Sequence, residues 1–131
     1  MPAEARVGAV RARAFTIPTD KPEAYGTGVF TATTLVVVEV EGGGKQGLGY
    51  TYSHACIVGL ILTALADAVG GQDCLDPPTA WLAMQRTVRN LGREGLAATA
   101  ISAVDAALWD LKAKLVGLPL AAQASGWHVL E

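Results

Sequence analysis

Two pairs of ionisable residues near the end of the chain have the right types for acid–base or metal chemistry. Lys112 and Lys114 are two positions apart, and Asp105 and Asp110 are five positions apart. On a helix, a spacing of two turns the lysine side chains about 200° apart, so they cannot converge on one substrate atom. A spacing of five does not align the aspartates on one helix face. We therefore expect structural contacts from the aspartates and a solvated face for the lysines.

The histidines and cysteines also lack partners at the spacings that catalysis or metal binding requires. His54 and His128 are isolated, and Cys56 and Cys74 form no paired-cysteine motif. A structural zinc site needs four ligands, which usually occur as close pairs of cysteine and histidine. A nucleophilic cysteine needs an identifiable base beside it. The sequence therefore predicts no catalytic residue, no metal ligand and no cofactor in this chain, and two reduced thiols.

The composition is that of one folded domain. Of the 131 residues, 51% are hydrophobic and 17% are charged, and the net charge is -2. A disordered chain would be less apolar and more strongly charged. A near-neutral chain has no general attraction to nucleic acid or to an anionic membrane, so we expect neither partner. The apolar stretch 55–66 is too short to span a bilayer and no secretory signal is evident, so we expect a cytoplasmic protein.

Alternating apolar residues predict three strands, over residues 7–17, 33–41 and 47–52. The second strand is the clearest, because β-branched residues occupy every other position. Glycines at 42–44 allow a tight turn into the third strand. The three strands therefore predict an antiparallel meander, in which one face of the second strand consists of Thr34, Val36, Val38 and Val40.

The connection between the first two strands is predicted to be a long loop. Pro18 is expected to end the first strand, because proline lacks the N–H that a central strand position needs. Residues 19–31 are rich in glycine, proline and polar side chains. Loops of this length are often functional lids, so residues 19–31 are candidates for a role in binding.

Helical periodicity predicts three helices in the rest of the chain, over about 53–69, 77–91 and 96–116. Ser53 is expected to cap the first helix, and Asp76 followed by proline is a strong start signal for the second. The expected fold class is α+β, a three-stranded antiparallel meander followed by three helices. The predicted apolar stripe of the second helix is Trp81, Met84, Val88 and Leu91. The third helix has a stripe of small residues, which another element could approach closely: Ala100, Ala103 and Ala107.

The third helix also carries a family signature. Residues 100–114 read AISAVDAALWDLKAK, and residues 117–120 read GLPL. This pattern resembles the signature helix of the mandelate racemase/muconate lactonizing enzyme family of the enolase superfamily. The IPT-x-K-P segment at 17–22 and the RNLGREG segment at 89–95 agree with that resemblance. It covers about residues 5–120 and implies an enolase N-terminal domain-like fold, the family's capping domain.

The resemblance implies where the chemistry of a full-length enzyme would lie. Family members remove a proton next to a carboxylate, with magnesium and a Lys or His base held by a (β/α)₈ barrel that follows the capping domain. The loop at 19–31 and the loop after the third strand are implied to fold over the barrel mouth. Tyr25, Tyr52 and His54 are therefore candidates for contacts to a small carboxylate substrate, such as a sugar acid. The alternatives are that Tyr52 packs in the sheet and that Tyr25 is a mobile loop residue.

The pattern changes abruptly after Leu120. We expect residues 1–120 to form the capping domain and residues 121–131 to be a divergent tail where the barrel would begin. A barrel needs on the order of 200 residues or more, so we expect the barrel to be absent. A capping domain shortened by truncation, frameshift or cloning would be inactive alone and would expose apolar surface, including the small-residue stripe. The alternative is a stand-alone, non-enzymatic module that binds a separate barrel or self-associates, so the sequence leaves enzyme status open.

Overall fold

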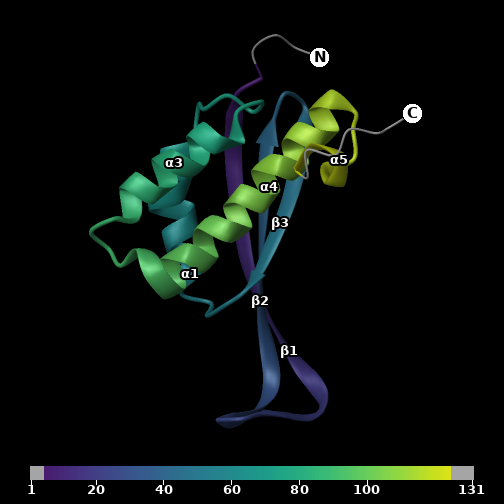
Figure 1. The fold of residues 1–131 in the computed structure, drawn as a ribbon, viewed down its shortest axis with the longest axis vertical. Coiled ribbons are helices and arrows are strands. Elements are labelled where there is room, and N and C mark those ends of the chain that lie inside the picture. The colour runs from purple at the N-terminus through teal and green to yellow at the C-terminus, as the bar shows by residue number, and fades with distance from the viewer. Residues whose placement is uncertain (1–4, 125–131) are drawn as a thin grey trace.

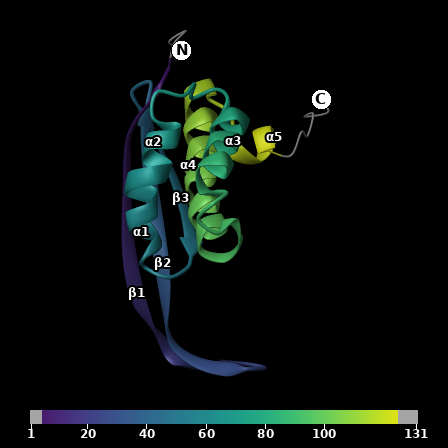
Figure 2. The same cartoon turned by 90° about the vertical axis from the view of Figure 1, so that its left-hand side faces the viewer.

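An antiparallel three-stranded sheet carries all the helices on one of its faces (Figures 1 and 2). The computed structural model describes residues 5–124. The strands are β1 (Val7–Tyr25), β2 (Gly28–Gly42) and β3 (Lys45–Tyr52), in the order β1-β2-β3. The predicted α+β meander followed by helices is therefore confirmed. The helical elements, in chain order, are α1 (Ile57–Leu60), η1 (Ile61–Leu65), α2 (Ala66–Val69), α3 (Pro77–Val88), η2 (Arg93–Ala97), α4 (Ala98–Val116) and α5 (Leu120–Ala124).

The hydrophobic core lies between the helices and the inner face of the sheet. Val36, Val38 and Val40 of β2 have no exposed surface, as the β-branched alternation predicted. The residues of β2 that alternate with these valines point to the outer face of the sheet, which faces away from the helices. The helices contribute fully buried side chains to the same core, among them Ile61, Leu65, Met84, Val88, Val104 and Leu111.

Glycines of β3 let α4 come unusually close to the sheet. A Cβ added at Gly47 would lie 2.0 Å from the carbonyl oxygen of Ala107, and one at Gly49 would lie 2.2 Å from that of Ala103. No side chain fits at either strand position. The predicted close approach along the small-residue stripe is confirmed, and its partner is β3. The expectation that the isolated domain exposes this stripe is wrong, because Ala100, Ala103 and Ala107 have no exposed surface.

The predicted loop at 19–31 is wrong, because both flanking strands continue through it. Pro18 pairs with Ala32, and pairing resumes from Glu23 opposite Phe30 after an irregularity in register. β1 is an edge strand, where a residue without an N–H is tolerated, whereas the prediction treated Pro18 as a central position. The two strands therefore extend as a hairpin past the end of β3, and residues 17–33 are called the hairpin arm below (Figure 1).

The first helical segment begins later than predicted and is not uniform. Helical structure starts at Ile57, and the Ser53 hydroxyl instead lies 2.8 Å from Oγ1 of Thr99 on α4. The Ser53 side chain therefore contacts α4 instead of capping the first helix. The segment 57–69 also contains the π-helical turn η1 between α1 and α2, which the periodicity did not predict.

The other two long helices are confirmed with shorter bounds. Asp76 caps α3, because its carboxylate accepts a hydrogen bond from the backbone N–H of Thr79 at 3.2 Å. α3 ends at Val88, so Leu91 lies outside it and is 64% exposed. Trp81 is 38% exposed, so the predicted apolar stripe is wrong at these two positions. The buried stripe of α3 is Pro77, Ala80, Met84 and Val88.

α4 is preceded by the short segment η2, in which only Glu94 and Gly95 are not helical. Ala97 already has helical values of φ -63° and ψ -40°, so the predicted helix start near residue 96 is confirmed. Glu94 is extended, and Gly95 has a φ of +74°, which favours glycine. At the other end Gly117 has a φ of +70° and caps the helix, as predicted. The predicted tail at 121–131 overlaps α5, and residues 125–131 lie outside the described residues. Within residues 5–124, no helix is long and apolar enough to cross a bilayer.

Candidate functional site

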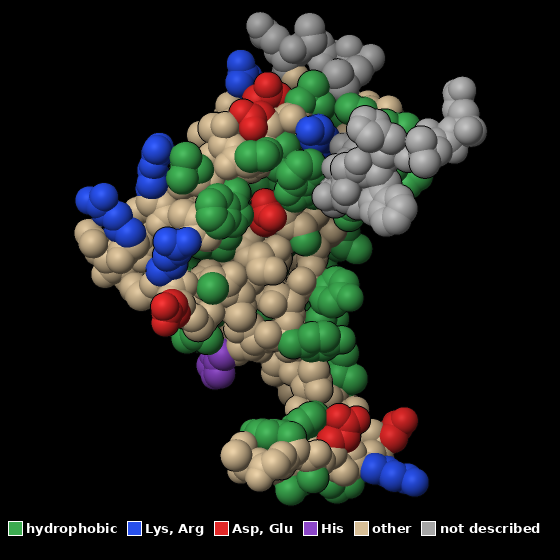
Figure 3. Space-filling view, viewed as in Figure 1, with side chains coloured by type: hydrophobic (Ala, Val, Ile, Leu, Met, Phe, Trp, Pro, Cys, Tyr) green, Lys and Arg blue, Asp and Glu red, His purple; other side chains and the backbone are tan. Residues whose placement is uncertain are grey.

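The predicted substrate-contact residues sit on two neighbouring features of the same end of the domain. β3 stops at Tyr52, opposite Leu35 of β2, and the chain then turns into the short loop before α1. The hairpin arm continues past that point, and its end curves toward the side of the sheet that carries the helices (Figure 2). A hollow lies between the arm and the helical body on this face (Figure 3). The arm and the loop after β3 are thus the elements that border the hollow.

Tyr25 is held at the end of the arm by local contacts. It ends β1, pairs with Gly28 across the turn and is 60% exposed. Its ring centroid lies 5.6 Å from that of Phe30 at an interplanar angle of 37°. A Cβ added at Gly28 would lie 3.0 Å from the Tyr25 hydroxyl oxygen, so this glycine makes room for the ring. Tyr25 therefore belongs to a hairpin rather than to the predicted loop, and this packing fixes the direction of its ring.

Tyr52 lies on the outer face at the end of β3. It is 63% exposed, and its ring meets that of Tyr50 edge-on, with centroids 6.1 Å apart. Tyr52 thus belongs to the sheet and packs on a neighbouring ring, but most of its surface is free. Its place on the outer face, opposite the helices, makes Tyr52 the least suited of the three to reach a ligand in the hollow.

His54 is an exposed side chain with one defined hydrogen bond. Its Nδ1 atom accepts from the backbone N–H of Cys56 at 3.0 Å. A ring nitrogen that accepts carries no proton, so in this geometry Nε2 carries the N–H and is free to donate. His54 belongs to the loop between β3 and α1, which borders the hollow. Its Nε2 atom is therefore a hydrogen-bond donor on one of the two elements at that border.

No ring contact or hydrogen bond joins any two of Tyr25, Tyr52 and His54 among the described residues. Tyr52 and His54 are two residues apart at the end of β3, whereas the ring contact of Tyr25 is with Phe30 of its own hairpin. The three do not form a hydrogen-bonded constellation among the described residues. This arrangement suits contacts to different parts of a ligand, and it does not resemble a nucleophile–base pair.

Asp110 makes the structural contacts that were predicted for the aspartates, and Lys114, which was predicted to lie on a solvated face, takes part in them. Asp110 accepts a hydrogen bond from the backbone N–H of Leu48 at 2.8 Å and forms an ion pair with Lys114 at 2.9 Å. Lys114 also donates to the backbone carbonyl of Gln46 at 2.8 Å. Lys112 instead lies 5.0 Å from the ring centroid of Trp109. The two lysines therefore make different contacts. Asp110 and Lys114 bind backbone groups along the edge of β3 that pairs with no other strand.

This edge contact is a feature that the sequence did not predict. The backbone of an edge strand is open to pairing with another chain, and side chains that cover it block such pairing. The i,i+4 spacing of Asp110 and Lys114 is a visible signal for an ion pair on a helix. Nothing in the spacing indicates that the pair also reaches Gln46 and Leu48, more than 60 positions earlier in the chain.

Asp105 has a different environment from Asp110. Its Oδ1 atom is buried and has no hydrogen-bond partner within the described part of the chain. Burial in apolar surroundings disfavours the carboxylate and raises the pKa of Asp105 above its usual value. Asp105 and Asp110 therefore do not share a site, in agreement with the spacing argument.

The residues present do not fit a magnesium site. Between residues 5 and 124, no group of three or more His, Cys, Asp or Glu side chains is placed to hold a metal ion. Magnesium prefers six oxygen ligands in octahedral geometry. The oxygen-bearing side chains of α4 are either engaged, as at Asp110, or isolated, as at Asp105. No step of a metal-assisted reaction is assigned to this domain.

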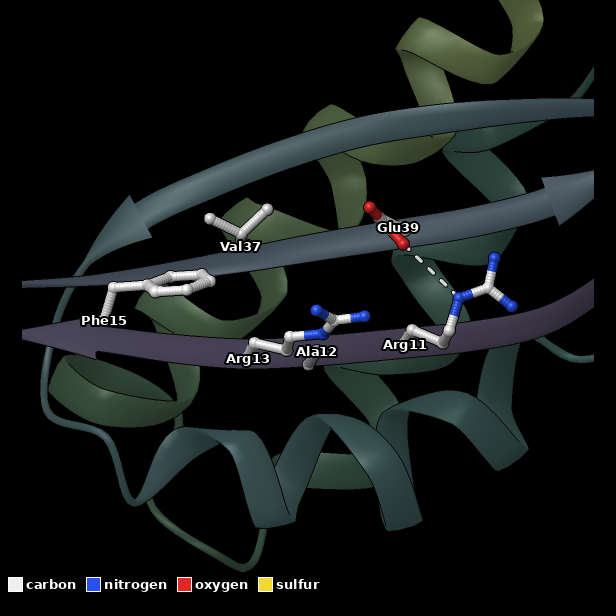
Figure 4. A pocket seen from close by; sticks show the side chains of 6 residues that line it. All are labelled: Arg11, Ala12, Arg13, Phe15, Val37 and Glu39. Carbon is white, nitrogen blue, oxygen red and sulfur yellow. Dashed lines mark hydrogen bonds and ion pairs between the residues drawn. The ribbon is translucent and has the colours of Figure 1, made fainter.

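A small pocket on the outer face of the sheet is a further concave feature with mixed chemistry (Figure 4). Its volume is about 70 Å³, which is far below the 300 Å³ or more of typical ligand pockets. Arg11 crosses it to bond Glu39 at 3.3 Å and also pairs with Glu41. This pocket is therefore a surface ion-pair network rather than a site for a sugar-sized molecule. Its lining residues are Arg11, Ala12, Arg13, Phe15, Val37 and Glu39.

Comparison with known proteins gives a consistent result. The family model described as "Mandelate racemase / muconate lactonizing enzyme, N-terminal domain" matches residues 9–123. L-talarate/galactarate dehydratase of Salmonella typhimurium is 37% identical over 95 residues, which are 70% of this chain and 24% of that protein. D-galactarolactone cycloisomerase of Agrobacterium fabrum is 29% identical over 122 residues, which are 92% of this chain and 32% of that protein.

Solved structures share the fold. A mandelate racemase/muconate lactonizing enzyme-like protein from Rubrobacter xylanophilus is 49% identical, with a TM-score of 0.88 over 90% of this chain and 33% of that one. L-talarate dehydratase from Polaromonas sp. JS666, complexed with Mg and L-glucarate, is 32% identical, with a TM-score of 0.77 over 91% of this chain and 35% of that one. The chain thus spans a quarter to a third of the length of these relatives. It belongs to the mandelate racemase/muconate lactonizing enzyme family of the enolase superfamily, and it corresponds to the family's N-terminal capping domain.

Proposed function

We propose that this domain closes over the active site of a sugar-acid dehydratase or cycloisomerase and helps to select its substrate. The proposed reaction starts with removal of a proton next to the substrate carboxylate, and the acid–base groups and magnesium ligands belong to a following (β/α)₈ barrel. The named relatives act on sugar acids or their lactones, which supports this substrate class. We propose that residues 5–124 alone have no turnover, because they bring together no acid, base or metal ligands.

The hairpin arm is the observation that carries this proposal. It extends past β3 as a two-stranded element, and its end curves to the helical side, where a hollow separates it from the helical body (Figures 2 and 3). A paired hairpin holds its end in a more defined position than an unpaired loop. Such an arm suits a cover that sits over a bound substrate and shields it from water.

The candidate residues carry hydrogen-bond donors that suit the carboxylate and hydroxyl oxygens of a polyhydroxy acid. Nε2–H of His54 can donate to a carboxylate or a hydroxyl oxygen, and the Tyr25 hydroxyl can donate or accept. Tyr52 also offers a hydroxyl, from the outer face of the sheet. We propose that Tyr25 and His54 contact substrate and that Tyr52, the third predicted contact, has a smaller effect.

A chimeric enzyme tests the proposal. Residues 9–123 of this chain replace the matching part of the Salmonella typhimurium L-talarate/galactarate dehydratase, and galactarate turnover is measured. We expect measurable turnover, and we expect Tyr25→Phe or His54→Ala to raise KM about tenfold through the loss of one hydrogen bond. Tyr50→Phe is the matched control, because Tyr50 is an exposed tyrosine of the outer face and is expected to leave KM unchanged.

The outcomes separate the two parts of the proposal. A folded chimera without turnover would contradict the capping role of this domain. Turnover with the same KM in the Tyr25, His54 and Tyr50 variants would keep the capping role and refute the proposed substrate contacts.

The outer face of the sheet favours a second candidate, a module that associates with itself. Large apolar or aromatic side chains there are about half exposed or more, and no helix covers them in Figure 2. Light scattering of the purified chain between 5 and 200 μM tests this. A monomer over the whole range contradicts self-association. The exposed side chains are Phe15, Leu48, Tyr50 and Tyr52.

A further inference from the structure

We infer that Ser53 and Thr99 are positioning residues for His54, because the hydrogen bond between their hydroxyl groups fixes the loop that carries this histidine. The inference rests on the proposed function, in which Nε2–H of His54 donates to substrate, and it adds what holds that donor in one place. The loop comprises residues 53–56, between the end of β3 and the start of α1 at Ile57.

The loop has little burial to hold it in place. Residues 54–56 are exposed, whereas Ile57 directly after them is 1% exposed and belongs to the core. Cys56, the N-cap residue of α1, makes no side-chain capping bond. Exposed segments with few apolar contacts are the parts of a protein that open locally at low cost. The position of the His54 ring therefore depends on the hydrogen bonds that the loop makes.

Two hydrogen bonds set the ring of His54 relative to its own stretch of backbone. Nδ1 of His54 accepts from the N–H of Cys56 at 3.0 Å, and the carbonyl oxygen of His54 accepts from the N–H of Ile57 at 3.2 Å. They leave Nε2 as the ring atom that donates. Both partners lie within three positions of His54, so these bonds do not fix the loop against the sheet or α4.

Ser53 makes the contacts that reach the rest of the domain. Its N–H donates to the carbonyl oxygen of Thr34 on β2 at 3.3 Å, one residue beyond the last pair of β2 and β3. Its hydroxyl oxygen lies 2.8 Å from Oγ1 of Thr99, which is 46 positions later in the first turn of α4. The loop is thus tied to the sheet through its backbone and to α4 through a hydroxyl group.

The surroundings of Thr99 determine which of the two hydroxyl groups donates. Oγ1 of Thr99 lies 2.8 Å from the carbonyl oxygen of Leu96, which can only accept. A hydroxyl group carries one hydrogen, so Thr99 donates to Leu96 and accepts from Ser53. The bond to Leu96 also selects one of the rotamers open to threonine in a helix. Ser53→Ala therefore removes the donor of the anchoring bond, and Thr99→Val removes its acceptor.

Backbone order parameters from ¹⁵N relaxation test the anchoring in the chain itself. The value at His54 is expected to be about 0.85 in the wild type, as in rigid backbone, and to fall toward about 0.6 in Ser53→Ala and Thr99→Val. Ser53→Thr keeps a hydroxyl group and is expected to restore the wild-type value. Thr87→Val is the matched control, because the hydroxyl of Thr87 bonds the carbonyl oxygen of Ala83 within α3. It is expected to leave the loop unchanged.

The chimera with the Salmonella typhimurium dehydratase tests whether Ser53 acts through His54. Ser53→Ala is expected to raise KM for galactarate about threefold with kcat unchanged, because the donor is less well placed for its bond to substrate. In a His54→Ala background, Ser53→Ala is expected to add nothing, since no ring is left to position. A residue that acts independently of His54 would have the same effect in both backgrounds.

Two results would overturn the inference. One is an unchanged order parameter at His54 in Ser53→Ala and Thr99→Val, and the other is an equal rise in KM with and without His54. A His54→Ala chimera with the KM of the wild-type chimera would instead contradict the proposed substrate contact. The order parameters would then still decide whether the hydroxyl pair holds the loop.

Discussion

The packing of α4 on β3 makes a sharp prediction about Gly49→Ala. The new Cβ would lie 2.2 Å from the carbonyl oxygen of Ala103 and 2.6 Å from the backbone nitrogen of Ala107. Real Cβ contacts are rarely shorter than 3.4 Å, and both neighbours are backbone atoms that cannot rotate away. The strand and the helix must therefore separate by about 1 Å over this contact.

The cost of that separation follows from what the contact buries. Ala103, Val104 and Ala107 of α4 have no exposed surface. A gap of 0.5–1 Å removes roughly a quarter to a half of each dispersion contact that spans it. Overpacking a tight core typically costs about 1–3 kcal/mol, and we expect the upper end, about 3 kcal/mol, because backbone meets backbone. That is a large part of the roughly 5–15 kcal/mol by which small domains are stable.

Urea unfolding of the chain measures this effect. With a typical slope of about 1–3 kcal/mol per molar urea, Gly49→Ala is expected to lower the midpoint by about 1–3 M. Gly59→Ala is the control, and it is expected to raise the free energy of unfolding, because a Cβ at Gly59 of α1 meets nothing within 4 Å. Alanine is favoured over glycine in helices, so this variant is expected to gain about 0.5–1 kcal/mol. A Gly49→Ala midpoint within 0.2 M of the wild type would refute the argument from close approach.

Three further predictions follow from the same structure. Met84→Ala removes a side chain with no exposed surface and is expected to cost about 2–5 kcal/mol in urea unfolding, whereas a loss under 1 kcal/mol would mean that the core collapses around it. Asp110→Ala removes the acceptor for the N–H of Leu48 and the partner of Lys114. It is expected to cost about 1 kcal/mol and to speed aggregation measured by thioflavin fluorescence, and unchanged aggregation would show that the β3 edge is protected otherwise. Burial raises the pKa of Asp105, so its contribution to stability is full below the unfolded pKa of about 3.9 and is lost as pH rises through the folded pKa. Asp105→Asn should remove that loss from the pH profile of unfolding, and identical profiles would contradict a buried carboxylate.

Local patterns in the sequence were sufficient for the body of the fold. Alternation placed Val36, Val38 and Val40 in the core, and the Asp76–Pro77 start and the Gly117 stop placed helix ends correctly. These features depend on side-chain periodicity and on capping chemistry within a few residues, which the sequence shows directly. The resemblance to the capping-domain family rested on the same helix, and the comparisons confirmed it.

The candidate site was predictable only as a set of residue types near two connections. The candidates Tyr25, Tyr52 and His54 follow from the family resemblance, which implies that residues 19–31 and the end of the third strand border the active site, and their roles stay predictions. The hairpin arm was misread as a loop because glycine, proline and polar residues are usual in loops. Whether Pro18 sits on an edge or in the centre of a sheet depends on the strand order, which no local pattern contains.

By itself, the sequence determined most element types, the buried face of β2 and the spacings on α4 that keep Lys112 from Lys114 and Asp105 from Asp110. The tertiary structure decided which side chains meet across long separations. Ser53 bonds Thr99 instead of capping a helix, and Asp110 with Lys114 covers an edge more than 60 positions away. The physical reason is that a hydrogen bond depends on distances of about 3 Å, which only the packing of α4 on β3 sets. The packing of the helices likewise decides that Oδ1 of Asp105 is buried without a hydrogen-bond partner among residues 5–124, which no local pattern shows.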